Sequence, residues 1–459
     1  MNRRNFIFLV IAGLVVNQRV SLSDENKPTE NITDRILSGL SQGNAVNIPD
    51  GVYEIDAGKI VLNSGSSLIF GNATVLKINN STSNEQSLFT LDGKEGVSIT
   101  GGHFISTDDS VVLFKIQNGS KNINVANISC EGCRLLFSDV LSPYDRINNS
   151  LLNENISITH CRGKANKLLT RRAFVEFHYT QNSQCVNCDV EGYYHGLMFW
   201  GGDSNPNRDG DENNQRKTSH LTFKNNNLRN LRQGGIWGSM GEYITIDTNS
   251  LENGGDVGID FEGCNSCVAT NNTVKNFRHG GLATFFICND ILFKNNTSIS
   301  TDEKNKIAAI FNATQKQSNK KIYFLNNKFL GEGVVAAFGQ NGAVTDLLIK
   351  ENTFTNITVD LTSNNNGKIQ FVDNKFAFSL LPSKAVEVVR VANVANADNE
   401  IVLTGNQVKS DHKWFADKSV FYIDTLSARN FQASPEVSNN AVDQVQFAKA
   451  NMFISKIKK

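Results

Sequence analysis

Residues 254–263 read Gly-Gly-Asp-Val-Gly-Ile-Asp-Phe-Glu-Gly and place three acids within seven residues. In a β-strand the side chains alternate between two faces, so Ile259 and Phe261 share one face while Asp260 and Glu262 share the other. The apolar face must point inward, so we expect the two carboxylates to project into solvent side by side, about 7 Å apart along the strand. That separation suits the carboxylate pairs that cleave glycosidic bonds.

A repeat surrounds this stretch. Short alternating strands, such as residues 221–224, precede asparagines that recur every 22 to 32 residues, at Asn226, Asn249, Asn272, Asn296, Asn327, Asn352, Asn374 and Asn406. We interpret each period as one coil of a solenoid. At the turn, each asparagine is expected to bond its counterpart one coil away and to take the left-handed backbone conformation. About fourteen to sixteen such coils would fill the chain, which predicts an all-β, elongated parallel β-helix.

The first 23 residues have the features of an export signal. Arg3 and Arg4 precede an apolar run over residues 6–16, which is too short to span a bilayer. The paired arginines also fit twin-arginine export, and both routes remain open. Either route predicts a periplasmic or extracellular protein that has no stable insertion in the membrane after the signal is removed.

An amphipathic helix is predicted next, over residues 31–43. Asn31 or Thr33 can cap its start and Gly43 can end it. Its apolar stripe consists of Ile36, Leu37 and Leu40. The helix would cap the open end of the solenoid.

The predicted domain organisation has three parts. After the export signal over residues 1–23, the β-helix and its N-terminal cap occupy residues 24–430. A C-terminal cap or tail over residues 431–459 follows the last clear strand, which lies near Phe421.

The charge balance narrows the partners. The chain contains 45 basic and 45 acidic residues, so it lacks the basic excess that nucleic-acid binding requires. We therefore predict a polysaccharide partner and no nucleic acid, and we leave monomer and homo-oligomer open.

Eight cysteines include three Cys-X-X-Cys pairs, which begin at Cys130, Cys185 and Cys264 and have the spacing of zinc ligands. One zinc ion cannot bridge the last two pairs, because about three coils of roughly 4.8 Å separate them. We therefore predict no metal. The cysteines would instead stack on adjacent coils as thiols or disulfides, with Cys161 beside Cys185 and Cys264 beside Cys288.

A loop over residues 203–217 interrupts the repeat. It imitates the start of a calcium-binding loop, but its first position is not Asp and Arg216 takes the place of the final Glu. We predict no cofactor, with Ca²⁺ as the alternative. A third interpretation makes the loop a wall or lid of a cleft.

A step of 23 residues superimposes the central coils. The overlay predicts an inward stack of Ile236, Ile259 and Leu282. On the outward face it places Trp237 beside Asp260, and likewise Phe285 beside Glu262. A second outward column consists of His195, Gln233, Asp256 and His279. Exposed rings beside carboxylates suit the apolar faces of sugars, so this face predicts a carbohydrate cleft.

The helix, the coils of about 23 residues and three motifs occur together. The motifs are Phe199-Trp-Gly-Gly-Asp, Gly235-Ile-Trp-Gly-Ser and Asp256-Val-Gly-Ile-Asp-Phe-Glu. In combination they resemble the pectin-lyase-like superfamily of right-handed parallel β-helices, which includes phage tailspikes and bacterial exopolysaccharide depolymerases. The twin-arginine-like start also resembles the periplasmic β-helix protein of colanic acid gene clusters. Tailspikes differ in lacking an export signal and in carrying trimerising tails.

The resemblance implies a protein that acts on a polysaccharide through paired acids on the outer face. We predict a glycoside hydrolase that cleaves a bacterial exopolysaccharide or capsule. Glu262 would be the acid and Asp260 or Asp256 the base. The wider set of catalytic candidates adds Glu242, Asp203 and His195. Sugar-binding candidates are Trp200, Trp237 and Phe285.

Two other functions remain open. In a polysaccharide lyase, His195 or His279 would remove the proton beside a uronate carboxylate, which Arg232, Arg278 or a cation would neutralise. Gln233 and His279 belong to the same substrate-binding column. The third function is that of a binding or assembly protein without catalysis.

Overall fold

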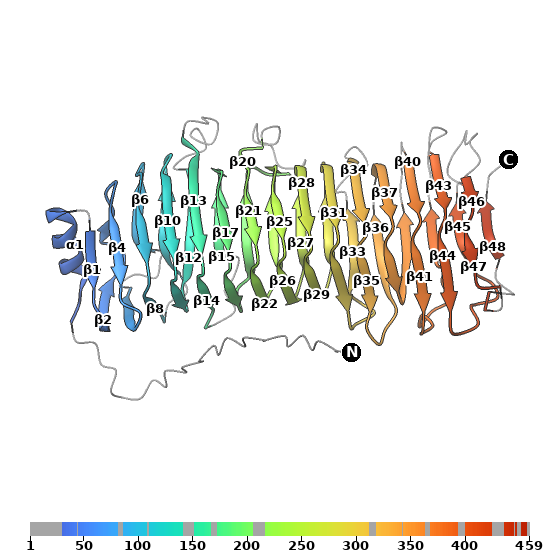
Figure 1. Ribbon diagram of the computed structural model, residues 1–459, viewed down its shortest axis with the longest axis horizontal. Helices are drawn as coiled ribbons and strands as arrows, with labels where there is room; N and C mark the ends of the chain where they lie inside the picture. Colours follow the sequence, from blue (N-terminus) through green and yellow to red (C-terminus); the bar gives the residue numbers. More distant parts are fainter. Residues whose placement is uncertain are drawn as a thin grey trace, which may run out of the picture.

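Three parallel sheets run along the whole molecule, and the chain visits each of them in every coil (Figure 1). This computed structural model describes residues 30–43, 45–80, 86–107, 110–140, 151–166, 172–204, 216–311, 318–341, 343–362, 368–392, 400–424, 436–444, 446–447 and 451–456. The predicted all-β fold is confirmed as a right-handed parallel β-helix with one N-terminal helix. Within the described ranges, no helix is long and apolar enough to cross a membrane.

Sheet A and sheet C contain fifteen strands each, which agrees with the predicted number of coils. Sheet A consists of β2 (Gly51–Asp56), β5 (Thr74–Asn79), β8 (His103–Ile105), β11 (Ser129–Glu131), β14 (Arg162–Lys164), β18 (Asp189–Glu191), β22 (Asn227–Leu231), β26 (Ser250–Gly254), β29 (Thr273–Phe277), β32 (Thr297–Ser300), β35 (Lys328–Gly331), β38 (Thr353–Thr355), β41 (Lys375–Phe378), β44 (Gln407–Ser410) and β47 (Ala441–Val442).

Sheet C consists of β3 (Ile60–Val61), β6 (Gln86–Asp92), β9 (Val111–Gln117), β12 (Arg134–Asp139), β15 (Ala173–His178), β19 (His195–Trp200), β23 (Ile236–Ser239), β27 (Val257–Glu262), β30 (Gly280–Phe285), β33 (Lys306–Phe311), β36 (Ala336–Asn341), β39 (Ile357–Thr362), β42 (Val389–Ala392), β45 (Ser419–Asp424) and β48 (Asn451–Lys456).

Sheet B has eighteen strands, because three of its coils are split into two short strands. They are β1 (Ala45–Ile48), β4 (Ser67–Phe70), β7 (Ser98–Thr100), β10 (Lys121–Ala126), β13 (Asn153–Thr159), β16 (Thr180–Gln181), β17 (Gln184–Val186), β20 (Thr218–Ser219), β21 (Thr222–Lys224), β24 (Gly241–Glu242), β25 (Thr245–Asp247), β28 (Asn265–Thr270), β31 (Asn289–Lys294), β34 (Ser318–Leu325), β37 (Ala343–Lys350), β40 (Lys368–Val372), β43 (Glu400–Thr404) and β46 (Glu436–Ser438).

The last coil extends beyond the strand that the sequence marks as the last. Strands β46, β47 and β48 add to sheets B, A and C after β45, which contains Phe421. The prediction that clear strands end near Phe421 is therefore wrong. The division of the chain at residues 23 and 430 stays a prediction, and the export signal over residues 1–23 lies outside the described residues.

Helix α1 (Thr33–Gln42) lies at the N-terminal end of the solenoid (Figure 1). The Asn31 side chain accepts a hydrogen bond from the Thr33 N–H at 3.0 Å, so Asn31 serves the start of the helix as expected. Gly43 follows its end. Ile36 and Leu40 are buried, but Leu37 is 36 % exposed, so its place in the apolar stripe was predicted wrongly.

The asparagine ladder is confirmed and is part of the core. In each rung, the backbone N–H and the side-chain NH₂ both donate to the Oδ1 of the asparagine one coil further on. For example, Asn272 donates to Asn296 at 2.9 Å from both groups. The ladder runs from Asn226 to Asn440, one rung beyond those found in the sequence. Because these amides are buried, each bond also satisfies a group that would otherwise be unpaired.

The left-handed conformation does not fall on the rungs, as predicted, but on the residue before each of them. Asn271 has φ 58° and Asn295 has φ 59°, directly before Asn272 and Asn296. The rung itself has to direct both its N–H and its side chain along the solenoid axis. The preceding residue therefore makes the bend, and asparagine is common there because it tolerates positive φ.

All eight cysteines are buried thiols. Cys185 pairs in register with Ile158 rather than with Cys161, so the predicted stack of Cys161 on Cys185 is wrong. Cys185 lies instead beside Cys188, with the sulfur atoms 3.6 Å apart. Among the described residues, no group of three or more His, Cys, Asp or Glu is arranged to hold a metal ion. The calcium-like loop falls at residues 205–215, outside the described residues.

One hydrophobic core fills the solenoid from end to end. It begins with Ile32 before α1 and reaches Phe447 near the C-terminus. Aromatic rings stack along the axis on successive coils, as Phe293 and Phe324 do at a centroid distance of 4.8 Å. The continuous core fixes which side chains of sheet C face outward, and therefore where a site can form.

Candidate functional site

Strand β27 lies between β23 and β30 in sheet C, in the predicted register. Ile236, Ile259 and Leu282 are paired neighbours and are fully buried in the core. The alternate residues therefore face outward. Trp237 pairs with Asp260, and Glu262 pairs with Phe285, as the overlay predicts.

Asp260 faces outward but is only 1 % exposed, so the prediction that it projects into solvent is wrong. Its neighbours on the adjacent coils are the large ring of Trp237 and the fully buried Ala283. Within the described residues, its Oδ1 has no hydrogen-bond partner. Burial, followed by the negative charge of Glu262, raises the pKa of Asp260 well above its usual value.

Glu262 lies two residues further along the same face and is less buried. The Trp237 Nε1–H donates to its Oε1 at 3.1 Å, and the Ser204 hydroxyl donates to its Oε2 at 3.3 Å. Burial raises the pKa of Glu262 to about 7 despite these two donors. At neutral pH this carboxyl can therefore both hold and release a proton, as a general acid must.

A strip of aromatic rings continues from Trp237 along the outer face. The Trp237 ring stacks on Trp200 at 5.8 Å and on His195 at 5.4 Å. Trp200 in turn lies 6.3 Å from His178. Half-buried stacked rings beside an acid provide the kind of surface on which sugar rings pack.

His195 is held in one tautomer. Its Nδ1 accepts a hydrogen bond from the Gly234 N–H at 3.1 Å, so the proton of the neutral ring sits on Nε2. Burial lowers the pKa of His195 to about 4, although the charges of Asp256 and Glu176 act in the opposite direction. His195 is therefore a neutral hydrogen-bond donor at neutral pH and not a free base.

Asp256 and His279 lie at the other end of the sheet C strands. The His279 Nδ1 is 2.8 Å from Asp256 Oδ1, and both are at least partly exposed. Gln233 belongs to the same column, because its carbonyl accepts the Asp256 N–H at 3.4 Å. Six residues of strand separate Asp256 from Glu262, or about 20 Å, so these two acids cannot act on one glycosidic bond.

Two other predicted acids fall on different sides of Glu262. Glu242 belongs to β24 of sheet B, where its carboxylate accepts from the Asn265 amide at 2.6 Å, and the structure does not bring it to the sheet C face. Asp203 is half-buried near the end of β19, and its negative charge contributes to the raised pKa of Glu262. Of these two acids, only Asp203 joins the site.

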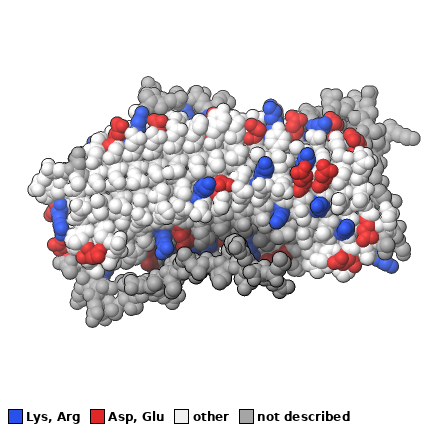
Figure 2. Space-filling model, viewed as in Figure 1, with Lys and Arg blue, Asp and Glu red and all other residues white. Residues whose placement is uncertain are grey.

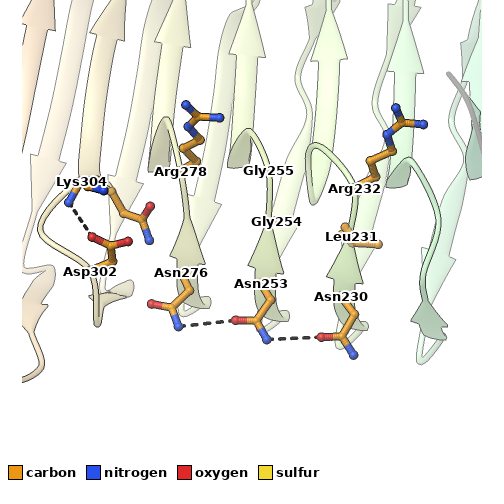
Figure 3. Close-up of a pocket in the computed structure, with 11 residues that line it drawn as sticks. Asn230, Leu231, Arg232, Asn253, Gly254, Gly255, Asn276, Arg278, Asp302 and Lys304 are labelled. Atoms are coloured by element: carbon orange, nitrogen blue, oxygen red, sulfur yellow. Dashed lines mark hydrogen bonds between the residues drawn. The ribbon is translucent and has the colours of Figure 1, made fainter. Parts of the chain in front are cut away.

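Arg232 and Arg278 lie in the turns that lead from sheet A to sheet C. Both are exposed and line a hollow of about 600 Å³ (Figure 3). Phe285 is half-buried and packs against the small apolar cluster of Val257, Ala283 and Ala309 beside the carboxyl pair.

The sequence analysis missed a buried ion pair on the same face. Arg134 lies 3.3 Å from Glu176, and both are almost completely buried. Glu176 also lies 3.4 Å from His178, and these interactions lower its pKa to about 2 in spite of burial, the largest single influence, which raises it. Glu176 and His178 occupy the columns of Asp260 and Glu262 three coils earlier. Extending the overlay backward by three coils would have found them.

Charges on the molecule are mixed in sign. On the face shown in Figure 2, lysines and arginines are interspersed with acids and form no continuous basic patch. This fits the predicted absence of a nucleic-acid partner, which stays a prediction.

No family model matches the chain, and no curated protein matches it either. Several solved structures do. Bacteriophage phi29 gene product 12 in its pre-mature form is 14 % identical, with a TM-score of 0.56 over 89 % of this chain and 56 % of that one. The mannuronan C-5 epimerase AlgE6 A-module of Azotobacter vinelandii is 12 % identical, with a TM-score of 0.46 over 94 % and 97 % of the chains. The surface adhesin PfbA of Streptococcus pneumoniae is 11 % identical, with a TM-score of 0.46 over 79 % and 91 %.

The likeness is one of fold. The chain is a parallel β-helix protein, and at these identities the activity of the neighbours does not carry over to it. Its function has to be inferred from the side chains on the outer face of the β-helix.

Proposed function

We propose that this β-helix protein is a glycoside hydrolase that cleaves a bacterial exopolysaccharide or capsular polysaccharide. The observation that carries the proposal is the Glu262 carboxyl, whose pKa of about 7 and exposure beside Trp237 suit a general acid. The aromatic strip of Trp237 and Trp200 offers the sugar-binding surface. The predicted export of the chain would place the enzyme where such polymers occur.

In this mechanism Glu262 protonates the glycosidic oxygen. Asp260 is the buried partner whose charge state is tied to that of Glu262, so that the pair resists losing both protons. The acid best placed to act on water or on the anomeric carbon is Asp203, because its charge reaches Glu262. His195 donates its Nε2 proton to a sugar hydroxyl or ring oxygen.

A lyase is the second candidate, and one contact favours it. If the Nδ1–H of His279 donates to Asp256, its Nε2 is free to accept a proton from a sugar carbon. Arg278 is the neighbouring residue and could neutralise a uronate carboxylate. This arrangement makes His279, rather than His195, the base of a lyase.

Cleavage assays on capsular and exopolysaccharides test the proposal. Reducing ends report both reactions, whereas ultraviolet absorbance of an unsaturated sugar reports only a lyase. We expect Glu262→Gln to lower turnover by about a hundredfold or more, since it removes the proton donor. Asp360→Asn is the matched control, because Asp360 is an exposed acid four coils further along the same column as Asp260.

Three results would change the proposal. Equal turnover by wild type and Glu262→Gln would remove Glu262 from the mechanism. An unsaturated product that disappears in His279→Gln would establish the lyase. Tight binding of a polymer with no cleavage by the wild type would favour a binding protein.

A further inference from the structure

A hollow with an excess of positive charge lies in the turns between sheets A and C, at the end of β27 opposite Glu262 (Figure 3). Its floor contains Gly254 and Gly255 from the turn after β26. Arg232 and Arg278 rise from the coils on either side.

The register explains why the hollow is open. Leu231, Gly254 and Phe277 are paired neighbours, so Arg232, Gly255 and Arg278 occupy the same position in three successive coils. At about 4.8 Å per coil, the two arginines start roughly 10 Å apart. A Cβ on Gly255 would lie 2.2 Å from the Arg232 carbonyl, so the middle coil carries no side chain between them.

The cations of the hollow are not neutralised by the protein. Arg232, Arg278 and Lys304 line it together with a single acid, Asp302. Within the described residues, none of the three cations forms an ion pair. Arg232 lies over the Tyr194 ring at 5.6 Å, a contact that orients the guanidinium but leaves its charge unpaired.

Arg229, three residues before Arg232, shows the usual state of a surface arginine in this protein. Its guanidinium forms ion pairs with Asp189 and with Glu191, the latter at 2.9 Å. Two unpaired arginines and a lysine around one concave site therefore need a different explanation from ordinary solvation. Guanidinium groups bind carboxylates and sulfates through two parallel hydrogen bonds, which makes this site suited to an anion.

We propose that this hollow binds an acidic sugar residue, so that the polymer recognised by the protein is an anionic polysaccharide. The inference rests on the proposed action on a polysaccharide and specifies its substrate class. The shared chemistry is a carboxylate or a sulfate ester on a sugar ring. The anion would lie between the two arginines above Gly255, with the polymer continuing across sheet C toward Trp237 and Glu262.

Binding measurements in the Glu262→Gln background test this without cleavage. The probes are polygalacturonate, alginate and hyaluronate, the same polymers with carboxyl groups reduced to alcohols, and dextran with and without sulfate esters. We expect at least one anionic probe to bind. The double variant Arg232→Gln/Arg278→Gln should bind it at least about tenfold more weakly, since two charged hydrogen-bond donors are lost.

Lys328→Gln/Lys375→Gln is the matched control. Lys328 and Lys375 are exposed cations of sheet A, two coils apart with Thr353 between them, so this variant removes the same charge in the same geometry. It should bind the anionic probe as the parent does. Binding of the carboxylate probes or of dextran sulfate alone identifies which anion the hollow takes.

Some outcomes would overturn the inference. These are equal binding by parent and arginine variant, equal binding of the carboxyl-reduced probe, and no binding of any anionic probe. Failure of the two proposals can be separated. If acidic polymers bind through the arginines but wild type cleaves none, the hydrolase is refuted and the hollow stands. If wild type cleaves a polymer and the arginine variant binds it unchanged, the hollow is refuted and the hydrolase stands.

Discussion

Replacing Glu262 by Gln should stabilise the protein at neutral and alkaline pH. In the folded chain, burial raises the pKa of this carboxyl from 4.5 to about 7, so ionisation is opposed in the folded state and free in the unfolded one. The folded state therefore has its full stability below the unfolded pKa. It loses stability as the pH rises toward 7, and the loss is complete above that.

The size of the loss follows from the pKa values. Each tenfold change in an acid dissociation constant corresponds to about 1.4 kcal/mol, so a rise from 4.5 to about 7 amounts to roughly 3 kcal/mol. An unfolding entropy of about 2.1 cal/mol/K per residue gives roughly 1 kcal/mol/K for a chain of 459 residues. The Glu262→Gln variant should thus melt about 3 °C above wild type at about pH 8, and at the same temperature near pH 4.

Thermal melting followed by circular dichroism across this pH range measures the difference directly. The Asp360→Asn control removes an exposed carboxylate from the same column and should follow wild type at every pH. A wild type whose melting temperature rises between about pH 5 and 7, relative to Glu262→Gln, would refute the assigned pKa. Parallel curves for the two proteins would do the same.

Two further predictions concern hydrogen bonds. Trp237→Phe keeps the ring but removes the donor that lowers the pKa of Glu262, so the alkaline limb of the pH–activity profile should move to higher pH; a move to lower pH would contradict the assigned contact. Asn296→Ala removes a buried rung that exchanges hydrogen bonds with both neighbouring rungs, and should lower the free energy of unfolding by about 3 kcal/mol, whereas the exposed Thr273→Ala should change it little; equal melting temperatures would contradict the structural role of the ladder.

Spacing along the chain was enough to predict the coils and their register. Asn249 and Asn272 are 23 residues apart, and the same step relates Trp237 to Asp260, because every coil of a solenoid is built on the coil before it. Alternation along the strand then separates inward Ile259 from outward Asp260. These are local relations, and the sequence contains them directly.

Burial on the outer face could not be predicted in this way. Asp260 is covered because Trp237 and Ala283 flank it, and because Ala283 packs with Val257 and Ala309 outside the core. Nothing in the alternation distinguishes an outward residue in water from one under a second apolar layer. The pKa values that make the site reactive depend on that layer.

The hollow beside Arg232 was only partly predictable for a related reason. The two arginines were identified as anion-binding candidates, but Lys304 enters from the loop of a later coil, after Asn276. Only the structure shows that Gly255 leaves the space between the arginines empty.

The asparagine ladder separates the length of a coil from its alignment. Successive rungs are 22 residues apart between Asn352 and Asn374 but 34 apart between Asn406 and Asn440, and the amide bonds are the same at both. Extra residues are therefore accommodated as loops between strands, without shifting any neighbouring coil. A loop at the edge of the site could be lengthened, exchanged or transplanted from another β-helix while the rungs hold Asp260 and Glu262 in register. Substrate preference in such a scaffold can diverge through its loops faster than its framework changes.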